Sequence, residues 1–128
     1  MATFEQDRTV NAIANTACRL HRFVVFNAGV GNKAYDECGV AQGEADGICA
    51  EGVAAGDVFP MVVPDNCFAK VEAGALIVIG AVIATDNQGR AITAVSGAGN
   101  FELGKALQGA GAAGDIIEIQ FYKDRDQA

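Results

Sequence analysis

Residues 103–122, LGKALQGAGAAGDIIEIQFY, indicate the fold more clearly than any other stretch of the chain. In an extended chain Ile117, Ile119 and Phe121 point to one face, and the residues between them point to the other. This alternation predicts a half-buried β-strand. The GAGAAGD segment before it has no large side chain and several glycines that tolerate positive φ, so it predicts a tight connection from an earlier strand.

The same pattern occurs earlier in the chain, in residues 47–63, GICAEGVAAGDVFPMVV. When residues 104–121 are aligned with it, Gly47 matches Gly104 and the Ala-Gly-Asp triplet matches too, with one extra residue in the later loop. An internal duplication would explain the match, and so would chance in a chain this rich in alanine and glycine. Either way, both copies predict a strand, a small-residue loop and a second strand.

The two Ala-Gly-Asp turns supply four candidate structural residues, Gly56, Asp57, Gly114 and Asp115. Glycine permits the turn, and an aspartate carboxylate can accept backbone N–H groups where a strand begins. Pro60 has no N–H group to donate, so we expect the earlier copy to be an edge strand or to contain a bulge.

Strand and turn signals recur along the rest of the chain. RFVVFN at residues 22–27 is the first run of β-branched and aromatic residues. Further strands are expected at residues 76–79, 81–85 and 90–95. Asp86 and Gly89 fit the first and fourth positions of a hairpin turn. About eight to ten short strands, with turn signals at intervals of about ten residues, predict an all-β fold, a compact β-sandwich or barrel.

The chain of 128 residues is long enough for one domain with a real core. Residues 1–22 show neither clean alternation nor a sustained helical stripe, so we expect an extended N-terminal arm there. Residues 23–122 are expected to form the β domain, and residues 123–128 a charged C-terminal tail.

Charge and hydropathy exclude some classes of partner. The formal net charge is −7, with +1 in residues 1–28 and −8 in residues 29–128. Because an acidic body repels phosphate backbones, we expect no nucleic-acid partner. The longest apolar run, residues 73–84, is too short to span a bilayer, so we expect no membrane partner either.

The four cysteines, Cys18, Cys38, Cys49 and Cys67, include no C-x-x-C pair. Their spacing is not typical of a zinc site. The N-terminus lacks the succession of charged, apolar and small residues that marks a secretory signal. We therefore expect reduced thiols that act as small core residues in a protein made in the cytoplasm.

One motif imitates a nucleotide site. Residues 99–105, GNFELGK, satisfy the G-x-x-x-x-G-K pattern of a phosphate-binding loop. Ala106 replaces the serine or threonine that would ligate magnesium, and Glu102 places a negative charge where phosphates would bind. The glycines that follow do not suit the helix that such a loop must open. We therefore interpret Lys105 as an exposed strand residue.

Other candidate catalytic or metal-binding groups are isolated or mismatched. His21 is the only histidine, and the arginines near it oppose a proton-accepting role. The acids of one loop region, Asp36, Glu37, Glu44 and Asp46, do not match the calcium-loop pattern. We therefore expect no catalytic residues, no cofactor and no metal site, and we do not expect an enzyme.

The C-terminal half contains Gly74-Ala75, Gly80-Ala81, Thr85-Asp86, Gly89-Arg90-Ala91, Gly104-Lys105-Ala106-Leu107 and Ala113-Gly114-Asp115. This set resembles the small capsid decoration, or cement, proteins of tailed bacteriophages. Members of that family often carry a pattern close to AGA-x-I-x-x-G-x-x-V-x-x-D-x-x-G-R-A, followed by G-x-A-L-x-x-A and by GD with a terminal apolar strand. The resemblance runs from about residue 36 to residue 122. It rests on turn glycines and apolar strand residues, so it indicates fold more firmly than function.

The resemblance implies an all-β protein on the outer surface of an assembled head, commonly a homotrimer that bridges neighbouring major capsid protein subunits. It implies a location in the virion after synthesis in the host cytoplasm. The candidate capsid or inter-protomer contacts are Phe4, Arg8, Val10, Ile13, Arg19 and Arg22. Two alternatives stay open: another phage structural component of the tail or head-joining region, and a small β-barrel ligand-binding domain or enzyme.

Overall fold

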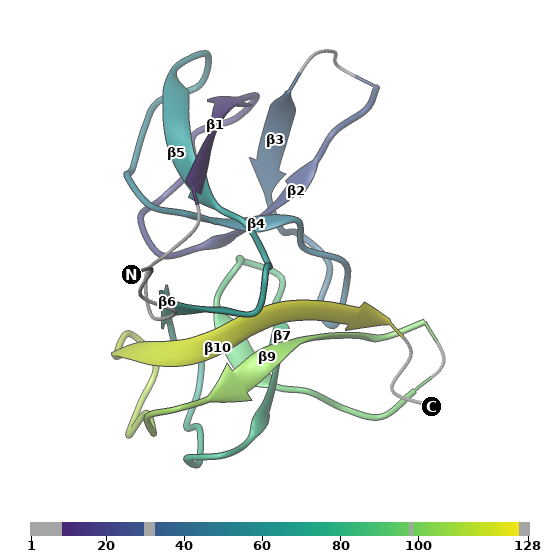
Figure 1. The fold of residues 1–128 in the computed structure, drawn as a ribbon, viewed down its shortest axis with the longest axis vertical. Coiled ribbons are helices and arrows are strands. Elements are labelled where there is room, and N and C mark those ends of the chain that lie inside the picture. Colours follow the sequence, from purple (N-terminus) through teal and green to yellow (C-terminus); the bar gives the residue numbers. More distant parts are fainter. Residues whose placement is uncertain (1–8, 30–32, 98, 126–128) are drawn as a thin grey trace, which may run out of the picture.

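The computed structural model describes residues 9–29, 33–97 and 99–125, which form ten β-strands and no helix. The strands are β1 (Thr9–Ala14), β2 (Phe23–Phe26), β3 (Ala34–Glu37), β4 (Gly47–Cys49), β5 (Val58–Val62), β6 (Cys67–Glu72), β7 (Val82–Thr85), β8 (Ala91–Thr93), β9 (Phe101–Ala106) and β10 (Ile116–Arg125). This confirms the predicted all-β fold. Figure 1 shows two lobes, with β1 to β5 in the upper one and β6 to β10 in the lower one.

The first lobe is a closed barrel in the order β1-β3-β2-β4-β5. Strand β1 closes it, because it pairs antiparallel with β5 on one side and parallel with β3 on the other. Five strands enclose little space, so most interior side chains must be small. The buried cluster consists of Ala12, Ala14, Cys18, Val24 and Cys49 around the larger Phe59 and Met61.

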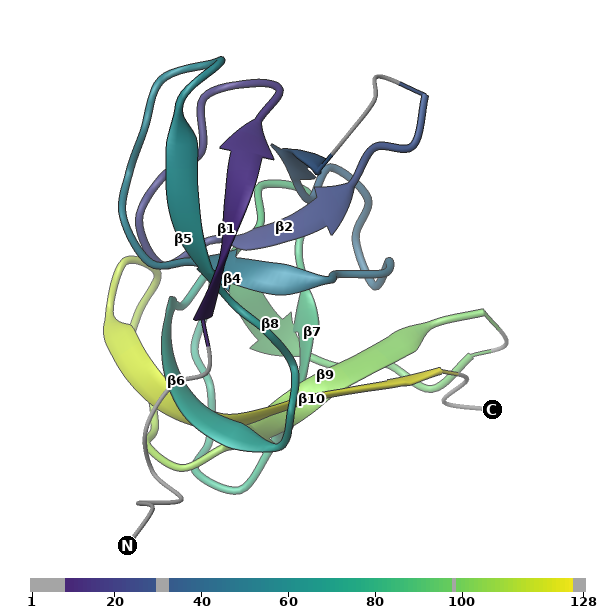
Figure 2. The same cartoon turned by 45° about the horizontal axis from the view of Figure 1, so that its top comes forward.

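The second lobe is a five-stranded sheet in the order β6-β10-β9-β7-β8. Its strand β10 pairs with both β6 and β9, and both figures of the whole chain show it running through the lower lobe (Figures 1 and 2). Ile117, Ile119 and Phe121 are buried, whereas Glu118 and Gln120 on the other face are half-buried. The alternation predicted for this strand is therefore confirmed.

The two lobes repeat one topology. If β1 to β5 are renumbered as β6 to β10, the closed barrel becomes a ring in the order β6-β8-β7-β9-β10, which is the order of the second sheet read in the opposite direction. The isolated parallel bridge between Ala73 and Ala91 corresponds to the parallel pairing of β1 with β3. The register agrees as well. Cys49 pairs with Met61, and Ala106 pairs with Ile119 at the aligned positions. The strand, loop, strand unit that the sequence predicts twice is thus present in both lobes.

The matched glycines of this repeat lie where strands crowd each other. A Cβ atom on Gly47 would overlap the side chain of Met61, and one on Gly104 would overlap the carbonyl of Gln120. Each glycine is therefore required by close approach within its sheet, and not by turn geometry, since both lie within strands.

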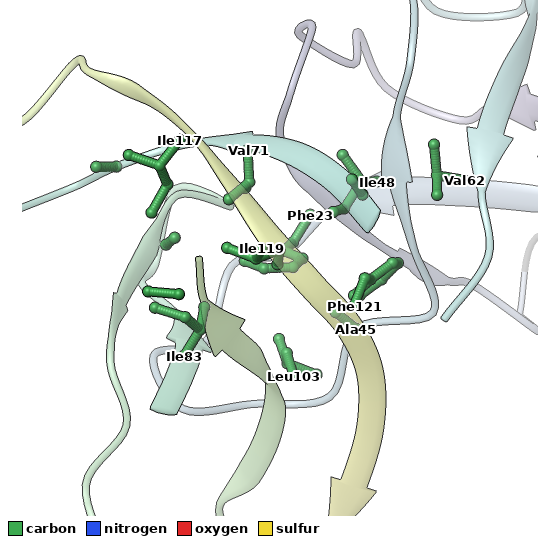
Figure 3. Packing of buried hydrophobic residues seen from close by; sticks show 14 of the residues in the cluster. Phe23, Ala45, Ile48, Val62, Val71, Ile83, Leu103, Ile117, Ile119 and Phe121 are labelled. Atoms are coloured by element: carbon green, nitrogen blue, oxygen red, sulfur yellow. The ribbon is translucent and has the colours of Figure 1, made fainter. Parts of the chain in front are cut away.

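One continuous core joins the lobes. Figure 3 shows Phe23, Ala45, Ile48 and Val62 from the first lobe among Val71, Ile83, Leu103, Ile117, Ile119 and Phe121 from the second. Because these side chains belong to one buried cluster, the two repeats pack as a single folded unit.

The boundary expected at residue 22 is wrong. Residues 9–14 form β1, which is central to the barrel, and not an extended arm. The strand is hard to recognise because Thr9, Val10 and Asn11 are all exposed, so alternation begins only at Ala12. At the other end β10 continues to Arg125, so the expected tail is partly strand. Residues 1–8 and 126–128 lie outside the described residues.

Two local expectations are also wrong. Residues 76–79 are not a strand; Ile77 makes an isolated bridge to Ala110 while its neighbours are exposed. Strand β5 is neither an edge strand nor bulged, since it pairs with both β1 and β4 and neither register shifts. Pro60 is accommodated because β4 ends at Cys49, and the Pro60 carbonyl accepts the Ala50 amide just beyond that end at 2.9 Å.

Candidate interaction surfaces

The residues considered as candidates for catalysis, nucleotide binding or metal binding do not lie together in the structure. Lys105 is an exposed residue within β9, as expected, so the G-x-x-x-x-G-K pattern does not form a loop at a helix start. His21 borders a cleft of about 250 Å³ whose lining includes Ile48, Val62 and Lys70. Within the described residues, no three or more His, Cys, Asp or Glu side chains converge to hold a metal ion. That same part of the chain has no helix long and apolar enough to cross a membrane.

All four cysteines are buried and free. Burial raises the pKa of Cys18 to about 12, and the nearby Cys49 thiol adds to the effect. Burial likewise raises the pKa of Cys38 to about 12, although a hydrogen bond with Thr85 opposes the shift. Such thiols are poor nucleophiles and poor metal ligands because both roles require the thiolate.

The acids of the region around residues 36–46 separate into two groups. The Asp36 carboxylate accepts hydrogen bonds from Asn15 (2.9 Å), Thr16 (3.0 Å) and Asn27 (2.9 Å). Burial opposes ionisation of Asp36, but these three hydrogen bonds outweigh it and lower its pKa. Asp36 therefore fixes the two loops that precede and follow β2.

Glu44 and Asp46 form the second group, and both contact Lys123 of β10. The Lys123 ammonium lies 2.7 Å from Glu44 and 2.6 Å from Asp46. Burial lowers the pKa of Lys123, but its hydrogen bonds to the two carboxylates together raise the pKa by more. The pKa of Lys123 is therefore higher than its ordinary value. These contacts join the second lobe to the first.

Two of the six candidate contact residues lie on strand β1. Val10 and Ile13 are 47% and 36% exposed on β1, whereas Phe4 and Arg8 lie outside the described residues. Val10 contributes to an open groove of about 680 Å³ whose apolar lining includes Phe26 and Tyr35. Ile13 lies on a different face, directly opposite the exposed Val58 of β5.

The two arginine candidates among the described residues have different environments. The Arg19 side chain is 56% exposed and forms a two-pronged ion pair with Glu37, with nitrogen to oxygen distances of 3.0 and 2.9 Å. Arg22 is only 7% exposed. It donates hydrogen bonds to Glu72 and to the carbonyl of Gln88, so its charge is used inside the protein, between the lobes.

The candidate turn residues stabilise the connections of the second lobe most directly. The Asp86 carboxylate accepts the backbone N–H groups of Gln88 and Arg90, both at 2.8 Å, and the Arg90 side chain at 2.9 Å. The Asp115 carboxylate accepts the Gly111 N–H at 2.9 Å. Asp57 acts through its backbone, since its carbonyl accepts the Ala14 N–H at 2.9 Å.

The turn glycines have the backbone conformation that favours glycine. Gly56, Gly89 and Gly114 have φ values of 90°, 76° and 98°. At these angles other residues are strained, which accounts for glycine at all three turns.

Sequence reasoning missed one exposed feature, at the far end of the second lobe. Leu76, Val78 and Ile79 are each about two-thirds exposed (66%, 67% and 66%). The signal was available in the sequence, because no charged residue occurs between Ala73 and Thr85.

Comparison with known proteins gives this fold a context. A solved structure, the head fiber gp8.5 N base in bacteriophage phi29, superposes with a TM-score of 0.70 over 91% of this chain and 94% of that chain. The two sequences are 17% identical, so this likeness shows a shared fold. No curated protein matches the sequence significantly. The family model for phage cement protein matches residues 4–121, which include nearly all of both lobes, and the chain therefore belongs to the phage cement protein family.

Proposed function

We propose that the protein is a non-enzymatic structural component of the virion that binds the outside of an assembled bacteriophage capsid. It stabilises the shell by bridging neighbouring major capsid protein subunits. The observation that carries this proposal is the cement-protein match over residues 4–121. The likeness to the phi29 head fiber base supports a fold suited to phage heads.

Bridging stabilises a shell because many weak contacts act together. A contact to one coat subunit brings the same molecule close to the next subunit, so the second contact forms at high effective concentration. Many individually weak contacts then oppose separation of the subunits. A compact unit whose exposed apolar residues lie on separate faces, as Val10 and Ile13 do, can contact several neighbours at once and is suited to this role.

The proposed partner is the major capsid protein, and the proposed assembly is a homotrimer on the outer capsid surface. The chain is made in the host cytoplasm. The net charge of −7 favours a protein partner over nucleic acid, because phosphate backbones would be repelled. No membrane takes part in this function.

The proposed capsid or inter-protomer contacts remain those at the N-terminal end, Phe4, Arg8, Val10, Ile13 and Arg19. Val10, Ile13 and Arg19 are accessible in the first lobe. Arg22 is the exception, since its side chain is only 8% exposed and pairs with the half-buried Glu72; its role in our proposal is to hold the two lobes together.

Reconstitution tests the proposal. Capsids that lack this chain are prepared from the phage that encodes it, mixed with the purified protein and collected by sedimentation. We expect saturable binding to the capsid exterior and a higher temperature for capsid disruption. A small unrelated acidic β-protein serves as the control. Failure to bind, or localisation to the tail in particle reconstructions, would contradict the proposal.

A further inference from the structure

The second lobe ends in two loops that contain no charged residue, residues 73–81 and 106–114. We call this pair of loops the uncharged end. The loops lie side by side, because Ile77 and Ala110 exchange backbone hydrogen bonds of 3.0 and 2.9 Å. In a chain with 20% charged residues and a net charge of −7, two adjoining uncharged loops form a distinct surface.

Three large apolar side chains project from this end. Leu76, Val78 and Ile79 are about two-thirds exposed, and the bridged Ile77 between them is buried. The second loop is built of glycine and alanine with one leucine and one glutamine, and the exposed Asp115 carboxylate at its edge accepts the Gly111 N–H. Three exposed large apolar residues within four positions make this end a candidate interaction site.

The fold itself does not require apolar side chains at two of these three positions. In the first lobe, the bridge between Cys18 and Val53 occupies the position of the bridge between Ile77 and Ala110. By this match, Ala17, Arg19 and Leu20 correspond to Leu76, Val78 and Ile79. Leu20 is apolar as well, but Ala17 is small, and Arg19 is charged and pairs with Glu37. The same topology therefore forms without the apolar side chains of Leu76 and Val78, so these two residues are a property of the surface of the second lobe.

The size of the patch argues against a second copy of the chain as its occupant. Three side chains and two small loops present on the order of a few hundred Å². A stable protein pair buries roughly 800 Å² on each partner. A patch below that size is better suited to an assembled lattice with many equivalent binding positions, because many weak contacts together stabilise the complex.

We propose that the uncharged end docks into an uncharged, apolar patch of the coat protein in the assembled capsid. This inference rests on the proposed function, and it specifies which end of the molecule contacts the shell. In this arrangement the first-lobe candidates Val10, Ile13 and Arg19 serve as contacts between protomers rather than as contacts to the coat protein.

The test compares two triple variants on capsids that lack this chain. The first is L76S/V78S/I79S. The matched control is V40S/V58S/V95S, in which the valines are 70%, 61% and 60% exposed elsewhere on the surface. Because all six positions are largely exposed, both variants should retain the thermal unfolding midpoint of the parent. We expect the first variant to bind capsids at least tenfold more weakly and the control to bind like the parent.

Each outcome distinguishes the inference from the proposed function. If the parent binds and the first variant binds equally well, the uncharged end is not the docking surface, although the proposed function stands. A larger loss in the control variant would likewise overturn the inference in favour of another face. If the parent itself fails to bind, the proposed function fails. If light scattering shows that the first variant dissolves a stable oligomer of the parent, the end is covered by a second copy, and the inference is overturned.

Discussion

The rings of Phe23 and Phe121 lie with their centroids 5.8 Å apart at an interplanar angle of 48°, although the two residues belong to different lobes. Both side chains are fully buried. Tilted ring pairs at this separation are favourable beyond the area they bury. This pair therefore couples the two repeats, and its loss should weaken the whole unit and not one lobe alone.

Replacement of Phe121 by alanine should lower the free energy of unfolding by about 3 to 5 kcal/mol, because it leaves a cavity between the lobes. Urea denaturation measures the change. Phe26 is the matched control, since its side chain is 43% exposed. We expect F26A to lose less than half as much. Equal losses in the two variants would show that the inter-lobe core is not the main source of stability.

Gly89 should tolerate alanine poorly for two separable reasons. Its φ of 76° strains any other residue, and a Cβ would lie 2.8 Å from the carbonyl oxygen of Phe23. Gly114 has a φ of 98° with nothing within 4 Å of the added atom, so G114A reports the backbone strain alone. That strain costs about 1 to 2 kcal/mol. In chemical denaturation G89A should lose at least about 1 kcal/mol more than G114A, and similar losses would rule out the contact with Phe23.

Local patterns sufficed for the parts of the fold that depend on neighbours in sequence. The alternation through Ile117, Ile119 and Phe121 predicts both the strand and its buried face, and the hairpin at Asp86 follows from turn chemistry. The repeat was visible because the same close approach requires glycine at Gly47 and Gly104. These features are set by a few adjacent residues.

Pairing over long range could not be predicted in this way. Strand β1 closes the barrel because it pairs parallel with β3 and antiparallel with β5. In the sequence, only the two alanines that point into the barrel indicate this strand. The run from Leu76 to Ile79 was interpreted as a strand because it is apolar, although it lacks alternation. Its exposure depends on the bridge between Ile77 and Ala110, which lie 33 residues apart in the chain.

The candidate surface was predictable only in part. Val10 and Ile13 are apolar residues in a polar neighbourhood, and both are exposed. Arg22 could not be distinguished from Arg19 by sequence, because its partner Glu72 is 50 residues away. The uncharged end was not predicted because apolar residues were assumed to be buried. The same assumption led to the wrong prediction of a strand at residues 76–79.

Asp36 should contribute stability at neutral pH that is lost in acid. Its pKa is lowered in the folded protein, so the folded state binds the proton less readily than the unfolded chain does. The contribution is therefore present above the unfolded pKa and disappears as the pH falls through the folded pKa. Thermal unfolding midpoints measured between pH 7 and pH 3 should fall less steeply for D36N than for the parent. D57N, at an exposed position, controls for the loss of one negative charge. An unchanged slope in D36N would contradict this role.

The four thiols should be almost inert in the folded protein. Cys18 and Cys38 have pKa values of about 12, mainly because burial disfavours the thiolate. At pH 8 a thiol with such a pKa is ionised to the extent of about 1 part in 10⁴, and thiol reagents attack only that form. A colorimetric disulfide reagent should therefore label the native protein very slowly and all four thiols after denaturation. S96C adds a thiol at an exposed position and should react at once with one equivalent. Fast labelling of Cys18 in the native parent, located by peptide mapping, would show that the barrel opens readily, since Cys18 is 1% exposed within the interior cluster of the barrel.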